Sequence, residues 1–207
     1  EQVERTINIT TLSRQEISSW KHIADMIYLL PDQGMLYEQH EGYFQLPDQT
    51  VQEFDENKRP ILSHVDLAQA ELLQNFETRL IKQADIVMLM AMFWDRFSLE
   101  EQQINFDYYE PRTVHESSLS ATPHALVACR IGRLDKSYKY LLQSARYNLD
   151  FIPRENYRNG LHLASYAGAW QAVVHGFAGV HSDGDLLILS PRLPKNWSSV
   201  TFKLYWR

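Results

Sequence analysis

Cysteine is almost absent from this sequence: Cys129 is the only one among 207 residues, which excludes an internal disulfide. This usage fits a reducing compartment, and we expect a cytoplasmic protein. No window of 18 or more apolar residues occurs, so no membrane-spanning helix is predicted. Basic residues do not predominate either: the sequence contains 20 Lys and Arg and 26 Asp and Glu, which gives a formal net charge of −6. Bulk charge therefore offers no attraction to nucleic acid or to an anionic membrane.

Several patterns of metal-binding and catalytic sites are also missing. His115-Glu116 is not followed by a second histidine four residues after the first, and no cysteine pair occurs, so no metal site is predicted. The sequence contains neither a glycine-rich mononucleotide loop nor a Gly-x-Ser-x-Gly elbow. Apolar residues are plentiful, at 44% hydrophobic and 12% aromatic, and they predict a sizeable core. The length suits one domain and part of another.

The N-terminal third begins with a helix signal. Ser13-Arg14-Gln15-Glu16 is a capping box, and apolar residues then recur at three- and four-residue spacing over residues 17–28, until Pro31 ends the pattern. Residues 31–66 carry turn chemistry and no periodicity. We interpret them as a segment that crosses the mouth of a site, with a plain surface excursion as the equal alternative. A further helix is predicted at 66–77.

The middle of the chain holds its most apolar segment, residues 86–94, within a helix predicted from about 80 to 97. Because this run is apolar all round, we expect it to be buried all round. A β-strand is the alternative, but the length of the run and its Met and Ala content favour a helix. Ser98-Leu99-Glu100-Glu101 is a second capping box. Residues 106–120 are polar, aromatic and interpreted as a loop.

The last third predicts three helices and then strands. The first helix spans about 123–131 and is closed by Gly132 as a left-handed cap. The second is capped by Asp135, and its apolar stripe is formed by Tyr138, Leu141, Leu142, Ala145 and Leu149. The third spans about 163–178 and carries small residues that permit close helix contact. Strands are predicted at 186–189 and 200–206. Helix pairs separated by polar loops suit an α/α toroid with sites at the loop end, and a plain helical bundle is the alternative.

The two ends of the chain suggest a fragment. The sequence starts at Glu1 rather than at methionine, and it stops within the alternating pattern of 200–206. A two-stranded remnant is marginal in water without more sheet to pair with. We therefore expect a fragment, a processed product or a split polypeptide.

Two polar clusters precede predicted helices. Ser117 and Ser118 combine hydroxyls with the free backbone N–H groups of a helix start, which is an arrangement that binds phosphate or sulfate. Simple N-capping by these serines is the alternative. His162 and Ser165 repeat the arrangement at a second helix start, where a capped core histidine is the alternative.

Lys82 and Gln83 stand before the apolar run, and both can hydrogen-bond sugar hydroxyls. A lysine whose amine reaches the surface is the alternative. Aromatic side chains that sugar rings could stack on are Trp94, Tyr108, Tyr109, Tyr166 and Trp170.

Three motifs carry a family resemblance: residues 81–85 (Ile-Lys-Gln-Ala-Asp), residues 108–120 (Tyr-Tyr-Glu-Pro-Arg-Thr-Val-His-Glu-Ser-Ser-Leu-Ser), and Gly160-Leu161-His162 with Gly168-Ala169-Trp170. Together they resemble glycoside hydrolase family 65, whose members include maltose, kojibiose, nigerose and trehalose phosphorylases. Residues 191–197 resemble the start of that family's C-terminal β domain. The match holds from about residue 80 onward and is loose before it.

The resemblance implies an all-α fold, the second half of an (α/α)₆ barrel over residues 1–182, followed by the first strands of a C-terminal β domain over 183–207. It also implies inverting phosphorolysis, in which phosphate attacks the anomeric carbon of an α-glucoside opposite the leaving group. The products would be β-glucose 1-phosphate and a free sugar. Phosphate is then a co-substrate, and no cofactor is expected.

Site roles follow from the same resemblance. Phosphate is expected to bind Ser117, Ser118 and His162, with Gly168 a weaker candidate. The glucosyl unit is expected to bind a second set of residues, namely Lys82, Gln83, His115 and Glu116.

One departure from the family pattern matters. The family's general acid is a glutamate in a motif that precedes the matched region, and no such motif occurs in this chain. The chain is therefore expected to lack the proton donor, to need the N-terminal portion of the same enzyme and to be inactive alone. A family 65 hydrolase that uses water and a non-catalytic carbohydrate-binding module are the alternatives. The disaccharide linkage stays open, as does the oligomeric state, with a homodimer one arrangement.

Overall fold

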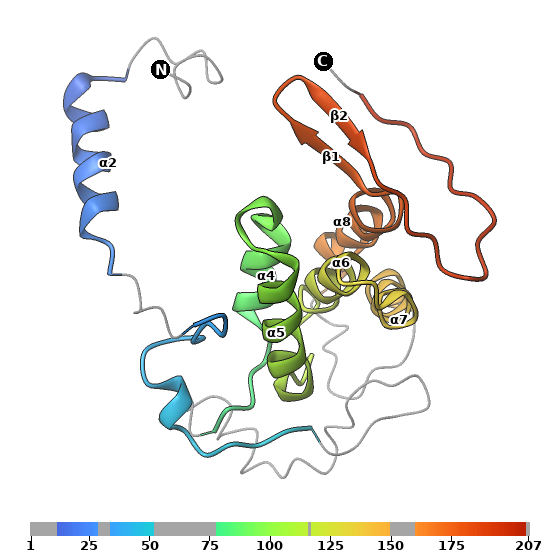
Figure 1. Ribbon diagram of the computed structural model, residues 1–207, viewed down its shortest axis with the longest axis horizontal. Coiled ribbons are helices and arrows are strands. Elements are labelled where there is room, and N and C mark those ends of the chain that lie inside the picture. Colours follow the sequence, from blue (N-terminus) through green and yellow to red (C-terminus); the bar gives the residue numbers. More distant parts are fainter. Residues whose placement is uncertain (1–11, 29–33, 52–77, 116, 150–159, 206–207) are drawn as a thin grey trace. The chain divides into compact units, whose positions relative to one another are not determined.

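The computed structural model describes residues 12–28, 34–51, 78–115, 117–149 and 160–205 (Figure 1). The chain divides into two compact units, Glu1–Pro31 and Asp32–Arg207. In the first unit, helix α2 (Arg14–Met26) begins with the predicted capping box: the Glu16 amide donates to Ser13 Oγ at 3.2 Å, and the Ser13 amide donates to the Glu16 carboxylate at 2.8 Å. None of its side chains is buried, so its apolar stripe is exposed within this unit.

The second unit is mostly helical, with a two-stranded sheet near the C-terminus. Its helices are α4 (Asp85–Met92), α5 (Leu99–Tyr109), α6 (Ala121–Arg130), α7 (Leu134–Ala145) and α8 (Leu163–Gln171). Shorter elements are the 3₁₀ turns η1 (Tyr43–Gln45), η3 (Trp94–Arg96) and η4 (Glu110–Arg112), and the π-helix η6 (Ala172–Phe177), which continues α8. No helix in these described ranges is long and apolar enough to span a membrane.

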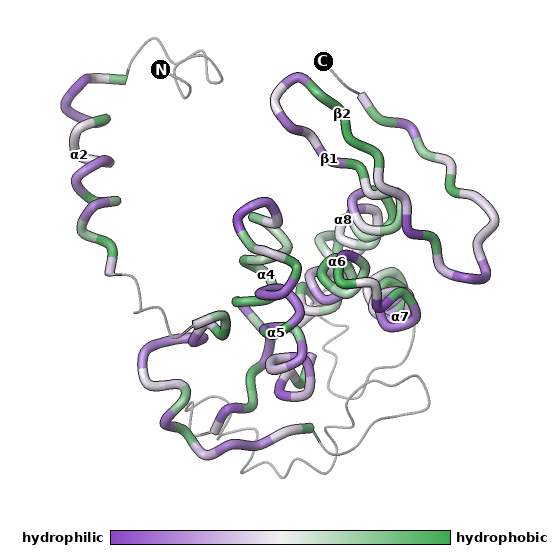
Figure 2. The backbone as a smooth tube through the Cα atoms, viewed as in Figure 1, coloured by the Kyte–Doolittle hydropathy of each residue, from purple (hydrophilic) through white to green (hydrophobic). Residues whose placement is uncertain are grey.

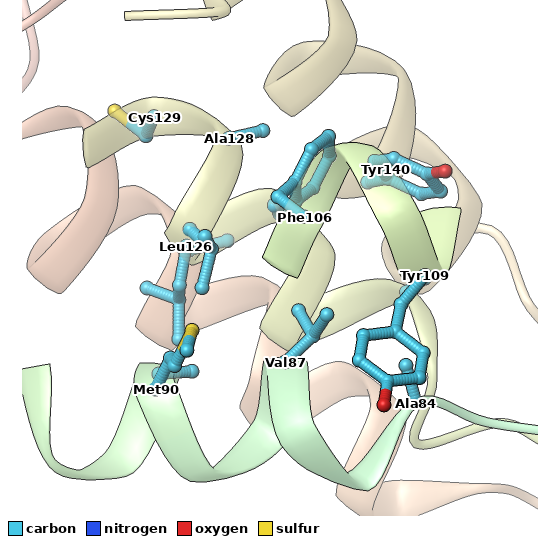
Figure 3. Packing of buried hydrophobic residues seen from close by; sticks show 14 of the residues in the cluster. Ala84, Val87, Met90, Phe106, Tyr109, Leu126, Ala128, Cys129 and Tyr140 are labelled. Atoms are coloured by element: carbon cyan, nitrogen blue, oxygen red, sulfur yellow. The ribbon is translucent and has the colours of Figure 1, made fainter. Parts of the chain in front are cut away.

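Helix α6 lies at the centre of this unit. It packs against α4, α5, α7, α8 and η6, and all of its residues from Ala121 to Cys129 are buried. Figure 3 shows Leu126 of α6 near Met90 of α4, and Phe106 of α5 between α6 and Tyr140 of α7. Burying each large apolar side chain contributes about 1.5–3 kcal/mol, so this cluster holds together the helices that carry the candidate site.

The helix predicted over 80–97 is shorter than expected. Backbone pairing occupies Ile81, whose amide donates to the Arg112 carbonyl and whose carbonyl accepts from the Val114 amide, both at 2.9 Å, and α4 therefore starts only at Asp85. The prediction of burial all round was also wrong, because Met92 is 65% exposed and Leu89 and Phe93 are exposed too. The neighbouring helices cover one face of α4 and leave the other open.

The predictions for the ends of the helices were partly correct. The capping box at Ser98 and the left-handed Gly132 (φ +81°) are confirmed. The segment predicted as a loop over 106–120 is helical as far as Arg112, through α5 and η4.

Asp135 does not cap α7: it lies in the first turn after the N-cap residue Arg133. Of the predicted α7 stripe, Leu142 and Leu149 are exposed. The helix expected at 66–77 and half of the 31–66 segment, residues 31–33 and 52–66, lie outside the described residues.

A β-hairpin follows η6. Strands β1 (Val180–Asp183) and β2 (Leu186–Leu189) pair antiparallel, with Val180 opposite Leu189 and a left-handed Gly184 (φ +57°) in the turn. The strand predicted at 186–189 is confirmed, and its partner β1 was missed. The strand predicted at 200–206 was wrong, since residues 200–205 form none, although Val200 and Phe202 pack on the small cluster around Val174 and Val180. The boundary expected after residue 182 falls inside the hairpin.

Candidate functional site

Lys82 and Gln83, which were expected to bind the glucosyl unit, lie beside the polar segment that leads into α6. The parallel bridge between Ile81 and Thr113 brings the two stretches together, although 32 positions separate them in the sequence. Lys82 is exposed, and the Gln83 side-chain amide donates to the Asp85 carboxylate at 3.3 Å. Backbone pairing thus places a lysine and a glutamine near His115.

His115 is buried, and both of its ring nitrogens have partners inside the chain. Nδ1 lies 2.8 Å from Ser120 Oγ, and Nε2 lies 3.2 Å from the Tyr140 hydroxyl. Its backbone is left-handed at φ +52°, the one non-glycine residue with positive φ among those described. The adjacent Glu116 lies outside the described residues. A sugar hydroxyl that bound the His115 ring would have to displace Ser120 or Tyr140.

Ser117 and Ser118 form the turn that enters α6, and both are partly exposed. Ser117 Oγ accepts from the Leu119 amide at 3.2 Å, and the Ser117 carbonyl accepts from the Ser120 amide at 3.1 Å. Among the described residues, the N-cap residue Ser120 makes no side-chain capping bond, whereas Ser117 does cap the amide of Leu119 in the preceding turn. A helix start next to two hydroxyls attracts anions through the helix dipole and its first amides.

His162 is the N-cap residue of α8, and Asn148 orients it. The His162 amide donates to Asn148 Oδ1 at 2.8 Å, and that oxygen also accepts from the Tyr166 hydroxyl at 3.0 Å. The side-chain amide nitrogen of Asn148 lies 3.1 Å from His162 Nδ1. Asn148 Oδ1 also lies 3.2 Å from His162 Nδ1, so the Asn148 side chain can hold this ring in either tautomer.

Gly168 lies where α8 crosses the start of α6. A Cβ atom on this residue would lie 2.1 Å from Thr122 Oγ1, so the close approach of the two helices requires glycine. Beside it, Thr122 and Ser144 share a hydroxyl contact of 2.9 Å, and Ser144 and Ser165 each donate to the other's carbonyl. This hydroxyl network was missed in the sequence, where Ser165 was considered only as an anion ligand.

A cleft of about 350 Å³ opens between α4, α6 and α8. Leu119, Thr122 and Gly168 line it near the start of α6, and Trp94 and His181 line it farther along. The rings of Trp94 and His181 stack with centroids 4.4 Å apart. Of the predicted site residues that the structure describes, only Gly168 lines this cleft, while Ser117, Ser118 and His162 lie at the starts of the helices that border it. Among the aromatic candidates for stacking, Tyr109 is fully buried in the core.

A buried cluster of His115, His124 and Tyr140 lies beneath the Ser117–Ser118 turn, with ring centroids 4.6–5.1 Å apart. Burial lowers the pKa of His124 to about 4. Burial, and then the nearby His124 and Lys136, hold the pKa of His115 well below its usual value. Both rings are therefore neutral near pH 7. Neither His124 nor Tyr140 had been a site candidate, because no sequence spacing links them to His115.

The low pKa of His124 predicts loss of stability in acid. Its unfolded pKa is near 6.5, so below that pH the unfolded chain binds a proton that the folded ring excludes until about pH 4. Between pH 6.5 and 5, the free energy of unfolding should fall by about 1.6 kcal/mol through His124 alone. Thermal midpoints of the protein over this range test the expectation. His124→Asn, which keeps a donor for the Ser120 carbonyl, should flatten the slope, and an equal slope would contradict it.

The described ranges contain no group of three or more His, Cys, Asp or Glu side chains placed to hold a metal ion.

Comparison with known proteins gives consistent matches. The family model for the glycosyl hydrolase family 65 central catalytic domain matches residues 1–171. Kojibiose phosphorylase from Thermoanaerobacter brockii is 37% identical over 204 residues, which are 97% of this chain and 25% of that protein. Maltose phosphorylase from Bacillus subtilis (strain 168) is 36% identical over 193 residues, 93% of this chain and 25% of that protein.

A solved structure, a putative kojibiose phosphorylase from human microbiome, superposes with a TM-score of 0.68 at 32% identity, over 89% of this chain and 24% of that one. The chain thus spans about a quarter of the length of the relatives it matches. The family model covers most of its residues and the structural match has the same helical arrangement. The chain belongs to glycoside hydrolase family 65, within its central catalytic domain.

Proposed function

We propose that this chain is part of an inverting disaccharide phosphorylase, and that its helices α4–α8 belong to the second half of an (α/α)₆ barrel. The enzyme would cleave an α-glucosyl disaccharide with phosphate to give β-glucose 1-phosphate and a free sugar. The general acid would come from a part of the enzyme outside this chain. Family membership supports the proposal, as do the phosphorylases among the relatives.

The observation that carries the proposal is the start of α6, where the N-cap residue Ser120 makes no side-chain capping bond and the partly exposed Ser117 and Ser118 form the preceding turn. Inverting phosphorolysis needs a phosphate held opposite the leaving group, and a helix start with two adjacent hydroxyls supplies N–H and O–H donors to its oxygens. His162, oriented by Asn148, would provide a third donor from the start of α8. Lys82 and Gln83, which the bridge at Ile81 brings beside this segment, would bind the glucosyl unit.

Phosphate dependence is the decisive test. The full-length enzyme, incubated with kojibiose, maltose, nigerose or trehalose, is expected to release glucose 1-phosphate from one of them only when phosphate is present. Proton NMR of the first product should show the β anomer, because a single displacement inverts the anomeric carbon. Release of free glucose at a rate that phosphate does not change would contradict the proposal and favour the family hydrolase that uses water.

A further inference from the structure

A continuous chain of hydrogen bonds runs from the start of α6 to α7. Ser120 Oγ lies 2.8 Å from His115 Nδ1, and His115 Nε2 lies 3.2 Å from the Tyr140 hydroxyl. Tyr140 donates to the Glu110 carboxylate at 3.0 Å, and the same oxygen accepts from Lys136 at 2.8 Å. Four separate elements thus meet through side chains that the sequence places up to 30 positions apart.

The carboxylate at one end determines where every proton in this chain lies. Glu110, paired with Lys136, only accepts, so the single hydroxyl proton of Tyr140 points to it. The Tyr140 oxygen must then accept from His115 Nε2–H, which leaves Nδ1 to accept from the Ser120 hydroxyl. His115 is held as one neutral tautomer with both nitrogens engaged. The neighbouring His124 ring, edge-on at 4.6 Å, closes its remaining side.

The same residue also fixes the path of the backbone. A φ of +52° is uncommon for a residue with a side chain and persists only where the surroundings hold it. On its N-terminal side, the Val114 amide is tied to the Ile81 carbonyl at 2.9 Å. On its C-terminal side, Ser117 follows two positions later. The His115 ring is tied to the Ser117–Ser118 turn through Ser120, whose hydroxyl bonds His115 Nδ1 and whose amide donates to the Ser117 carbonyl at 3.1 Å.

We propose that Tyr140 and Glu110 are positioning residues, which act through His115 to place the Ser117–Ser118 turn for the phosphate co-substrate. His115 then serves the site by holding this turn, and not through contact with the sugar. The inference rests on the proposed function, because it assigns a role to residues that support the phosphate site of that reaction.

Two tyrosines on α7 provide the variant and its control. Tyr140→Phe removes the hydroxyl that joins His115 to Glu110 and keeps the ring. Tyr138→Phe makes the same change where the ring packs edge-on against Trp197, at a centroid distance of 5.9 Å. In the full-length enzyme, Tyr140→Phe is expected to raise the KM for phosphate about tenfold. This is the weakening of phosphate binding expected when one hydrogen bond that positions the turn is lost. The KM for the disaccharide should stay within about twofold, and Tyr138→Phe should leave both constants unchanged.

A double-variant comparison separates positioning from general damage. If the Tyr140 hydroxyl acts through the serines, adding Tyr140→Phe to a variant in which Ser117 and Ser118 are both alanine should change its KM for phosphate little. Glu110→Gln, which keeps an acceptor oxygen for Tyr140, should retain more of the phosphate affinity than Glu110→Ala. An unchanged phosphate KM in Tyr140→Phe, or equal rises in the KM values of both substrates, would overturn the inference.

The failure of the proposed function would look different. In that case the wild-type enzyme itself would show no phosphate-dependent cleavage. Crystal structures of the full-length wild type and Tyr140→Phe then still test the role of the hydrogen-bond chain. A shifted Ser117–Ser118 turn with a changed φ at His115 supports positioning by Tyr140, and a superimposable turn rules it out.

Discussion

Replacing Ser117 and Ser118 together by alanine in the full-length enzyme is expected to lower kcat/KM for phosphate by a factor of about 10²–10⁴. Each hydrogen bond to a charged group contributes about 1.5–3 kcal/mol, and about 1.4 kcal/mol corresponds to tenfold in affinity. The loss should appear mainly as a higher KM for phosphate, measured at a saturating concentration of the disaccharide. Binding of the disaccharide without phosphate should change little.

Single variants refine this result. Ser117→Ala also removes the contact with the Leu119 amide, so part of its effect reflects a looser turn. Ser118→Ala is the cleaner probe, because no contact of its hydroxyl within the turn is lost. Ser199→Ala, at an exposed position in the C-terminal segment, provides a serine control. A double variant that keeps the wild-type thermal midpoint and the wild-type KM for phosphate would exclude the two serines from the phosphate site.

Among the described glycines that lie in helices, Gly168 is the one whose replacement by alanine is expected to destabilise the fold most. The new Cβ would lie 2.1 Å from Thr122 Oγ1 and 2.9 Å from Thr122 Cβ, both in the buried seam between α8 and α6. Overpacking of this kind costs about 1–3 kcal/mol and outweighs the gain in helix propensity of about 1 kcal/mol. Thermal or denaturant unfolding of the protein measures the difference.

Gly176 provides the matched control for this prediction. It also lies in a helix facing α6, but a Cβ there would meet Leu126 at 3.6 Å, an ordinary contact. Gly176→Ala should therefore be neutral or slightly stabilising. Thr122→Ala should recover part of the stability lost in Gly168→Ala, because it removes the nearest atom. Equal stability of the two glycine variants would show that α8 can move away from α6 at little cost.

Local signals in the sequence predicted local structure well. The capping boxes at Ser13 and Ser98 and the left-handed Gly132 are correct because each depends on contacts within a few residues. The burial of α4 was misjudged for the opposite reason. Composition reports how apolar a helix is, whereas exposure depends on which neighbours cover each face, and Leu89, Met92 and Phe93 stay exposed.

The candidate site was only partly visible in the sequence. Ser117, Ser118 and His162 stand directly before helices, so their position could be predicted from helix signals alone. The bond between Tyr140 and His115 could not, because it depends on how α7 packs beside α6. Asn148 was missed likewise: a side chain from the turn after α7 orients a histidine 14 positions later. Local patterns thus located the expected ligands, and tertiary packing supplied the residues that hold them.

The hairpin has a practical consequence for producing the 207-residue chain by itself. In Figure 2, β2 is drawn as a hydrophobic stretch, and its side chains Leu186, Leu187 and Leu189 are all exposed. Within the described part of the chain, each of these two strands has an unpaired outer edge, and an apolar edge of this kind is a template for pairing between molecules. Recombinant preparations of the chain should therefore aggregate with increasing concentration. Lysine in place of Leu187 should act as a gatekeeper against that self-association.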